Sequence, residues 1–402
     1  MRTVRRRQRG LLPGLSGAVV AAVAAATLVA LPSSGASGGG SPDVVDVGPA
    51  GTTSRLAGAS RSAVISYTTR TVRGRRGTAT GLMLIPRGER PDGGWPVVVY
   101  GHMTTGAADR CAPTNGTPND TEKQKMQQGD DTTRALLRAG VAVLRPDYEG
   151  LGAPGPHPYL HGPSLGRAMV DMLTAVNRRW PALLGDRWVV SGHSEGAVAA
   201  LHAADRRRPQ VRDMTLVGIS AFTPVTRLEL LVQLLQVEPV PGPFVGELVG
   251  LAALLLKGHS ATDPAFRRLL MNGGLSARAR ALWPHLEDRC LADLSRTDSW
   301  GGLAPAQVLG PRGEEASRDL RRWLARHDVR HLHLADGVPL RVDLGLLDAV
   351  ALAPFTEQLI QTYRSRGTSV TVGRWPSGHS PTNSDGYATP DAVSWMVARL
   401  RG

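Results

Sequence analysis

Lysine is almost absent from this chain of 402 residues, and only three of its 47 basic residues are lysines. Aromatic residues are also scarce, at 4% of the chain, and no run of adjacent arginines after residue 36 exceeds three. A nucleic-acid-binding surface normally combines clustered basic side chains with aromatic rings for stacking. These scarcities argue against a nucleic-acid partner, so the net charge of +13 needs another explanation.

Long apolar runs are missing as well. The run Ala18–Leu31 spans 14 residues and Leu248–Leu256 only nine, whereas a membrane-spanning helix needs about 20. Five arginines precede the first run and small residues follow it, which is typical of a secretory signal peptide. We expect residues 1–36 to be this signal, cleaved near Ala36, with a membrane-anchored form as the alternative. Cleavage lowers the net charge from +13 to +8.

Cysteine occurs only twice, at Cys111 and Cys290. An even number of cysteines in an exported protein favours a disulfide, and two buried free thiols are the alternative.

Strand and helix patterns alternate along most of the remaining chain. Residues 37–58 are rich in Gly, Ser and Pro and are expected to form a flexible leader. An antiparallel strand pair is expected at 63–72 and 78–86, followed by repeated strand-helix-strand units. Strands are expected at Trp95–His102 and Val141–Asp147, where the apolar runs Pro96–Tyr100 and Gly140–Leu144 suit strands that are covered on both faces. The pattern predicts an α/β fold with a mostly parallel sheet and helices on both faces.

Between residues 223 and 305 the strand pattern stops, and successive helical segments follow one another. We interpret this as a helical cap inserted into a core formed by residues 59–222 and 306–402. The apolar segment Val245–Leu256 could line an acyl pocket or could be a plain structural helix.

The pattern Gly-x-Ser-x-Gly occurs three times, around Ser37, Ser164 and Ser194. Ser37 lies at the signal junction, and Ser164 follows a proline and is expected to cap a helix. Only Ser194 has a strand pattern before it and a helix of small residues after it. That context predicts a nucleophile elbow, a strained strand-to-helix turn that projects the serine hydroxyl beyond the sheet.

A serine hydroxyl needs a base, and the base needs an acid that fixes its tautomer. His379 follows a predicted strand in a loop that could reach Ser194, and we predict it as the base. Asp348 stands at the carboxyl end of the strand 339–345 and is the predicted acid, with Asp343 inside that strand as the alternative.

A tetrahedral intermediate also needs main-chain donors for its oxyanion. The N–H group directly after the serine, that of Glu195, is one candidate. Met103 or Thr104, in the loop after strand 95–102, is the other.

Several segments together resemble the secretory lipase family of the α/β-hydrolase fold, which includes fungal lipase A-type enzymes. The likeness covers roughly residues 60–402 and rests on four segments: Gly192–Gly196, Arg145–Gly152, Gly155–Leu160, and Thr104–Gly106 with Cys111–Pro113. It implies a triad of Ser194, Asp348 and His379, and it supports a Cys111–Cys290 bridge.

The resemblance also implies a helical cap and a secreted lipase or esterase. One position departs from the family pattern, which usually reads His-Gly-Thr-Thr-Gly: this chain has Met103 in place of the glycine. If that position requires a positive φ, the loop must differ, because a long side chain resists this conformation.

We therefore expect a secreted carboxylic ester hydrolase that works through an acyl-enzyme. No cofactor or metal is expected, because no group of histidines and carboxylates has ligand spacing along the sequence. The expected partner is a small-molecule or lipid ester, with transient contact to a lipid surface and a monomeric state. Two alternatives remain: an aminopeptidase or other amide hydrolase in which Glu149 and Glu195 hold a substrate ammonium, and a non-catalytic surface-binding protein.

Overall fold

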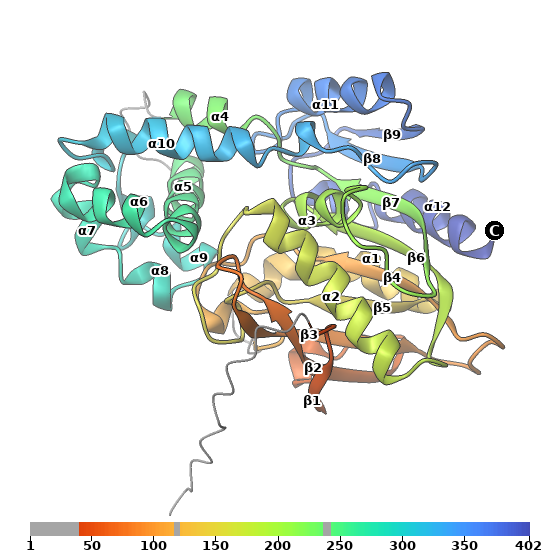
Figure 1. Ribbon diagram of the computed structural model, residues 1–402. Helices are drawn as coiled ribbons and strands as arrows, with labels where there is room; N and C mark the ends of the chain where they lie inside the picture. The colour runs from red at the N-terminus through yellow and green to blue at the C-terminus, as the bar shows by residue number, and fades with distance from the viewer. Residues whose placement is uncertain (1–39, 116–120, 236–242) are drawn as a thin grey trace, which may run out of the picture. The chain divides into compact units, whose positions relative to one another are not determined.

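A nine-stranded sheet forms the centre of the computed structural model, which describes residues 40–115, 121–235 and 243–402 (Figure 1). The strands in chain order are β1 (Val44–Pro49), β2 (Ala59–Arg70), β3 (Arg76–Pro86), β4 (Trp95–Gly101), β5 (Ala142–Pro146), β6 (Leu184–His193), β7 (Thr215–Phe222), β8 (Leu340–Gly345) and β9 (Val370–Trp375). Their order across the sheet is β1-β2-β3-β5-β4-β6-β7-β8-β9.

The sheet has an antiparallel edge and a parallel body. Strands β1, β2, β3 and β5 pair antiparallel in succession, whereas β5, β4, β6, β7, β8 and β9 pair parallel. The expected mostly parallel sheet is therefore confirmed. In such a sheet the carboxyl ends of the parallel strands meet at one edge, where loops can assemble a site.

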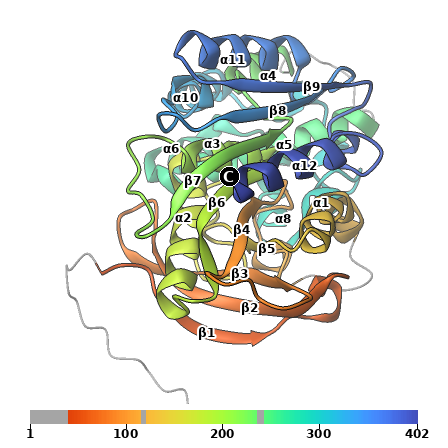
Figure 2. The same ribbon diagram turned by 90° about the vertical axis from the view of Figure 1, so that its right-hand side faces the viewer.

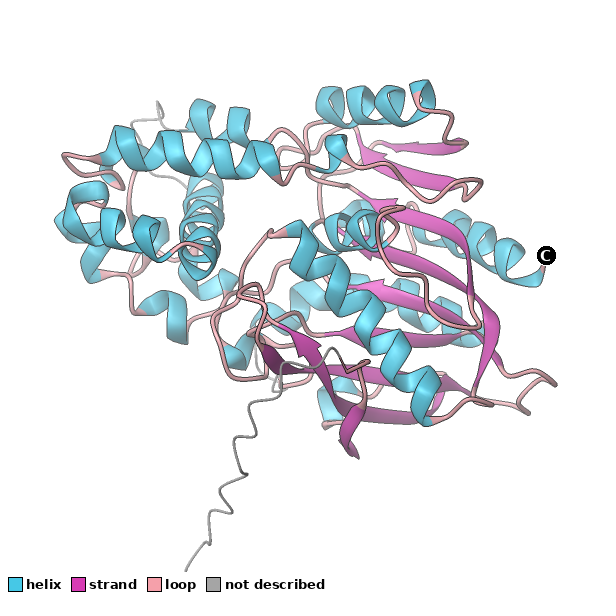
Figure 3. Ribbon diagram, in the orientation of Figure 1, coloured by secondary structure: helices cyan, strands magenta, loops and turns pink. Residues whose placement is uncertain are grey.

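Helices cover both faces of the sheet (Figures 2 and 3). The helices of the core are α1 (Thr121–Arg138), α2 (Gly162–Arg179), α3 (Glu195–Ala203), α11 (Ala353–Ser365) and α12 (Thr389–Arg401). Side chains of β4 alternate between two apolar clusters, because successive residues of a strand point to opposite faces. Val97 and Val99 join the cluster that contains α2 and α3, whereas Val98 and Tyr100 join the cluster that contains α1 and α12.

All the helices between β7 and β8 follow one another without an intervening strand. They are α4 (Leu228–Leu235), α5 (Pro243–Thr262), α6 (Pro264–Leu269), α7 (Ala277–Ala281), α8 (His285–Asp288), α9 (Leu291–Leu294) and α10 (Gly313–Arg326). We call them the inserted helices. They extend beyond the boundary expected at residue 305, because α10 packs against α4 and α5. The segment 236–242 lies outside the described residues.

The N-terminal part of the chain differs from the expected leader, which was drawn as flexible through residue 58. Residues 44–49 form β1, which pairs with β2 from Val44↔Tyr67 to Pro49↔Ala63. The β-branched side chains of Val44, Val45 and Val47 favour a strand here despite the surrounding Gly and Pro. The expected signal peptide, 1–36, lies outside the described residues.

A smaller difference concerns Ser164. His161 is the N-cap residue of α2, and its side chain accepts from the Ser164 main-chain N–H. Ser164 lies inside the first turn, where its hydroxyl donates to Glu149 at 2.5 Å.

Within the described residues, no helix has both the length and the apolar composition needed to cross a membrane.

Candidate active site

The turn between β6 and α3 holds Ser194 in a backbone conformation that is rare for a residue with a side chain, with φ 57° and ψ −114°. Two glycines make this turn possible. A Cβ on Gly192 would lie 2.2 Å from the carbonyl oxygen of Gly196, and one on Gly196 would lie 2.0 Å from that of Gly101. Because both obstacles are backbone atoms, only glycine fits at either position. The backbone therefore adopts the strained conformation expected of an elbow.

His379 links the Ser194 hydroxyl to Asp348. Its Nε2 lies 2.8 Å from Ser194 Oγ, and its Nδ1 lies 2.8 Å from Asp348 Oδ2. A carboxylate only accepts hydrogen bonds, so Nδ1 carries the proton and the lone pair of Nε2 faces the hydroxyl. The structure thus brings together the serine, base and acid predicted from the sequence, from three loops that follow β6, β8 and β9.

Main-chain donors hold the Asp348 carboxylate in place. Its Oδ1 accepts from the N–H groups of Val350 and Ala351, both at 2.8 Å, which leaves Oδ2 for His379. The alternative acid, Asp343, is occupied elsewhere: it forms a two-fold hydrogen bond with Arg341, with both distances 2.8 Å. This pair explains how an arginine and an aspartate can lie inside a buried strand, because neighbouring positions i and i+2 face the same side.

His193 was not singled out from the sequence, yet it packs against the base. Its ring centroid lies 5.2 Å from that of His379, and its Nε2 lies 3.2 Å from the His379 carbonyl oxygen. Burial lowers the pKa of His193 to about 3, so the ring is neutral near pH 7 and adds no positive charge beside His379. The only sequence signal was its place inside the elbow motif.

Met103 and Thr104 lie at the same pocket as Ser194 and His379. The N–H of Glu195 opens helix α3, where the first N–H groups lack partners within the helix. Among the described residues five non-glycine residues have a positive φ, and Met103 is not one of them. Methionine therefore causes no backbone strain at the position where the resembling family usually has glycine. The positive φ in this loop belongs to Gly106, at 147°.

Buried polar side chains contact the 102–106 loop and the first residue of α3. The Tyr148 hydroxyl donates to the His102 carbonyl at 2.9 Å, and the rings of Tyr148 and His102 stack at 4.4 Å. His157 Nε2 lies 3.1 Å from Glu195 Oε1, with both side chains almost fully buried. The Tyr159 hydroxyl lies 2.9 Å from Thr104 Oγ1. These contacts join distant segments and could not be predicted from spacing along the chain.

Glu149 and Glu195, the residues that could have held a substrate ammonium, both point away from the pocket. Glu149 accepts from the Val72 N–H at 2.9 Å and from the Ser164 hydroxyl, and Glu195 faces His157. Neither lines the pocket at Ser194. These two carboxylates therefore give no support to the aminopeptidase alternative, and the acidic side chain that does line the pocket is Glu247 of α5.

A disulfide joins Cys111 to Cys290, as expected, with a Cα–Cα distance of 5.5 Å. It connects the segment after the 102–106 loop to the start of α9, one of the inserted helices. A main-chain hydrogen bond from Leu291 N to Thr105 O, 2.9 Å long, lies beside it. The loop that carries Met103 and Thr104 is therefore tied directly to the inserted helices.

An apolar pocket opens over Ser194 and His379, with an empty volume of about 750 Å³ that includes open solvent. Its walls come mainly from α4 and α5, whose lining residues are Leu228, Leu231, Val232, Leu235, Glu247, Leu248, Leu251, Ala252 and Leu255. A second apolar pocket, with an empty volume of about 450 Å³ that includes open solvent, shares Val232, Leu235 and Ala252 with the first. Together they offer space for an apolar group next to the serine hydroxyl.

Several solved structures resemble this one, among them a lipase, an esterase and a putative hydrolase. Lipase A of Candida antarctica in its closed state matches with a TM-score of 0.69 and 16% identity over 89% of this chain and 90% of that one. A ligand-bound form of the rice cell wall degrading esterase LipA from Xanthomonas oryzae matches with a TM-score of 0.61 and 20% identity, over 89% and 96%. A putative hydrolase from Legionella pneumophila matches with a TM-score of 0.63 and 18% identity, over 85% and 88%.

These likenesses establish the α/β-hydrolase fold, as expected from the elbow and the sheet. No curated protein matches the chain in a sequence search. The family model of the secretory lipases matches residues 117–402, which include the elbow, the inserted helices, Asp348 and His379. That family and these neighbours support an ester hydrolase of the lipase or esterase kind in general terms. This chain therefore belongs to the secretory lipase family.

Proposed function

We propose that this protein is a secreted serine hydrolase that cleaves carboxylic esters through Ser194, His379 and Asp348. One observation carries the proposal: the line of hydrogen bonds from Ser194 through His379 to Asp348 lies at an apolar pocket. Ser194 Oγ attacks the ester carbonyl while His379 Nε2 takes the hydroxyl proton. The imidazolium then gives this proton to the departing alkoxide, which leaves an acyl group on Ser194.

Water completes the cycle. His379 removes a proton from the water as it attacks the acyl carbonyl, and the same proton returns to Ser194 as the acid leaves. Asp348 stabilises the imidazolium in both halves of the reaction. The main-chain N–H of Glu195, together with that of Met103 or Thr104, stabilises the oxyanion in each tetrahedral intermediate. Every step uses groups of the chain itself, ester and water.

The inserted helices would act as a cap that holds the acyl chain. The apolar walls of α4 and α5 favour esters of lipid-like or medium-length acids, because burying each methylene group contributes about 0.8 kcal/mol. Exposed leucines support transient contact with a lipid surface: Leu234 on α4 is 59% exposed, and Leu347, next to Asp348, is 73% exposed.

A fluorophosphonate probe and a pair of substrates test the chemistry. Wild type should react covalently with the probe at Ser194 and hydrolyse p-nitrophenyl butyrate, and Ser194→Ala should lose both, with kcat lower by about 10⁴-fold or more. Ser164→Ala, in another Gly-x-Ser-x-Gly segment, is the matched control and should keep the labelling. Retained hydrolysis in Ser194→Ala would refute the mechanism. Faster cleavage of the matching p-nitroanilide would instead favour an amide hydrolase.

Export is proposed from the arginines and apolar run of residues 1–36 and from the family's secretory members. Sequencing the N-terminus of material recovered from the culture medium tests it. A first residue close to position 37 is expected, and a chain that begins at Met1 would contradict cleavage.

A further inference from the structure

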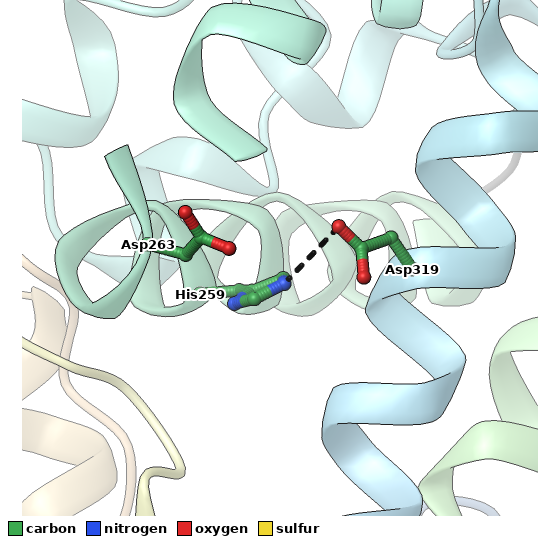
Figure 4. Close-up of side chains that lie close together, drawn as sticks. All are labelled: His259, Asp263 and Asp319. Atoms are coloured by element: carbon green, nitrogen blue, oxygen red, sulfur yellow. Dashed lines mark ion pairs between the residues drawn. The ribbon is translucent and has the colours of Figure 1, made fainter. Parts of the chain in front are cut away.

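His259, Asp263 and Asp319 form the single group of three or more candidate ligand side chains found among the described residues (Figure 4). His259 lies in the last turn of α5, Asp263 is the N-cap residue of α6, and Asp319 comes from α10. One candidate ligand atom from each lies within 4.8 Å of the other two. The group belongs to the inserted helices and contributes nothing to the pocket at Ser194.

The His259 ring is held firmly in place. It stacks on Phe266 with a centroid distance of 4.0 Å and on Trp323 with a distance of 5.0 Å. Its side chain is only 5% exposed. Nevertheless its Nε2 atom has no hydrogen-bond partner, which is unusual for a buried polar atom. Nε2 points toward Asp319 Oδ2, 3.8 Å away, which is too far for a hydrogen bond.

Neighbouring hydrogen bonds indicate which ring nitrogen carries the proton. The Thr262 hydroxyl donates to the His259 carbonyl at 2.8 Å, so it can only accept from His259 Nδ1, which lies 3.3 Å away. Nδ1 therefore bears the hydrogen, and Nε2 presents a lone pair. A buried lone pair aimed at a carboxylate oxygen is unfavourable unless a positive centre lies between them.

Both carboxylates leave an oxygen available for such a centre. Asp263 uses Oδ1 to accept from the N–H groups of Ala265 and Phe266. Asp319 directs Oδ1 toward Arg322, 3.5 Å away, and Oδ2 toward His259. Bonds of about 2.1 Å around a tetrahedral zinc ion place ligand atoms roughly 3.4 Å apart. The 3.8 Å separation of His259 Nε2 and Asp319 Oδ2 is close to that requirement.

We propose that His259 Nε2, Asp263 and Asp319 bind one Zn²⁺ ion that joins α5 and α6 to α10, with water as the fourth ligand. One imidazole and two carboxylates suit Zn²⁺ better than Ca²⁺, which takes oxygen ligands only. The expectation of no metal rested on spacing along the sequence, which cannot reveal a ligand 56 residues beyond Asp263. Leu251 and Leu255 on α5 line the pocket, so the ion would stabilise the helix that forms its wall.

Zinc content and thermal unfolding of the full chain test the site directly. After removal of metal with a chelator and dialysis against Zn²⁺, wild type should retain one zinc per chain. Its Tm should rise by about 5 °C when free Zn²⁺ is 100-fold above Kd. Ca²⁺ should leave Tm unchanged. Zinc retention below 0.2 per chain would overturn the proposal, and stabilisation by Ca²⁺ instead of Zn²⁺ would overturn the assignment of the ion.

Matched variants on one helix locate the site. Asp319→Asn should lose the bound zinc and the Tm rise, whereas Glu315→Gln, which removes an exposed carboxylate paired with Arg312, should keep both. Equal zinc binding by Asp319→Asn and wild type would assign the ion to another site and refute the proposal. Co²⁺ gives a second readout: its visible absorption bands in wild type should be those of a tetrahedral N/O site. His259→Gln should abolish these bands, and their persistence would also refute the proposal.

Discussion

At the scale of single residues, the site depends on two glycines that lack a Cβ atom as much as on the side chains that it brings together. Ser194 keeps its strained backbone because Gly192 and Gly196 let the strand and helix pass within van der Waals contact of Gly101. An added methyl group would meet main-chain oxygens, which cannot rotate away as a side chain can.

Gly196→Ala tests this close approach. Its Cβ would lie 2.0 Å from the Gly101 oxygen, so α3 must shift, and we expect a loss of about 1–3 kcal/mol in unfolding free energy and most of the esterase activity. Urea denaturation and p-nitrophenyl butyrate hydrolysis measure both. Gly48→Ala, whose Cβ would meet nothing within 4 Å, is the control. Unchanged stability in Gly196→Ala would show that the elbow has room.

The two aspartates of β8 and its loop separate catalysis from stability. Asp348→Asn should lower kcat by about 10⁴-fold with little change in folding, because the amide favours the wrong His379 tautomer. Asp343→Asn should instead lower stability, since it leaves Arg341 buried with a weaker partner, and should retain kcat per folded molecule. Steady-state kinetics and denaturation of both variants decide the assignment, and the opposite result would make Asp343 the acid.

At the scale of elements, the disulfide and the pocket wall connect the core to the inserted helices. The Cys111–Cys290 bond closes a loop with a sequence separation of 179, for which the chain-entropy model predicts about 5 kcal/mol at most. Replacing both cysteines by alanine should therefore lower Tm by several degrees and disturb the oxyanion loop. Calorimetry and kcat of the double variant measure this. An unchanged Tm would mean that the bond contributes little beyond the Leu291–Thr105 hydrogen bond.

Helix α5 should determine which acyl chains fit. Leu251→Trp would fill part of the pocket and is expected to lower kcat/KM for a twelve-carbon p-nitrophenyl ester by at least about 10-fold relative to the four-carbon ester. Leu234→Trp, at an exposed position of α4, should leave the ratio unchanged. A parallel loss for both esters in Leu251→Trp would place the acyl chain elsewhere.

Some helices and strands could be predicted from the sequence and others could not. Strands β4 and β5 were predictable because each contains a continuous apolar run, and the elbow was predictable from the glycines on either side of Ser194. Strand β1 was missed because Asp46 interrupts its valines and Asp43, Gly48 and Pro49 lie beside them, and pairing with β2 decides its conformation. Half of the residues of helix α10 are charged, and its packing against α4 depends on tertiary contacts. The same holds for the Glu195–His157 pair.

At the scale of the whole molecule, buried neutral histidines control the response to acid. Burial lowers the pKa of His102, His193 and His202 to about 3, whereas the unfolded chain titrates near 6.5. Between these values the unfolded state binds more protons, so stability present above pH 6.5 is lost as pH falls. These three groups alone give a slope of about 4 kcal/mol per pH unit, and His161, whose pKa burial also lowers to about 3, adds to it. Asp147 opposes them, because burial raises its pKa to about 6.

We therefore expect unfolding free energy to fall steeply from pH 6.5 to pH 4, as measured by urea titrations at several pH values. His202→Gln should reduce the slope by about 1.4 kcal/mol per pH unit. His331→Gln, at an exposed position, should leave it unchanged. A pH-independent stability in this range would contradict neutral burial of these histidines.

The presence of a single disulfide also simplifies the refolding of the denatured protein. Two cysteines allow one intramolecular pairing, and both are used in it. A denatured, reduced chain therefore has no wrong internal pairing in which to be trapped, and thiol-disulfide shuffling has nothing to correct. Refolding this protein from inclusion bodies requires an oxidant, but it requires neither a disulfide isomerase nor a glutathione redox buffer.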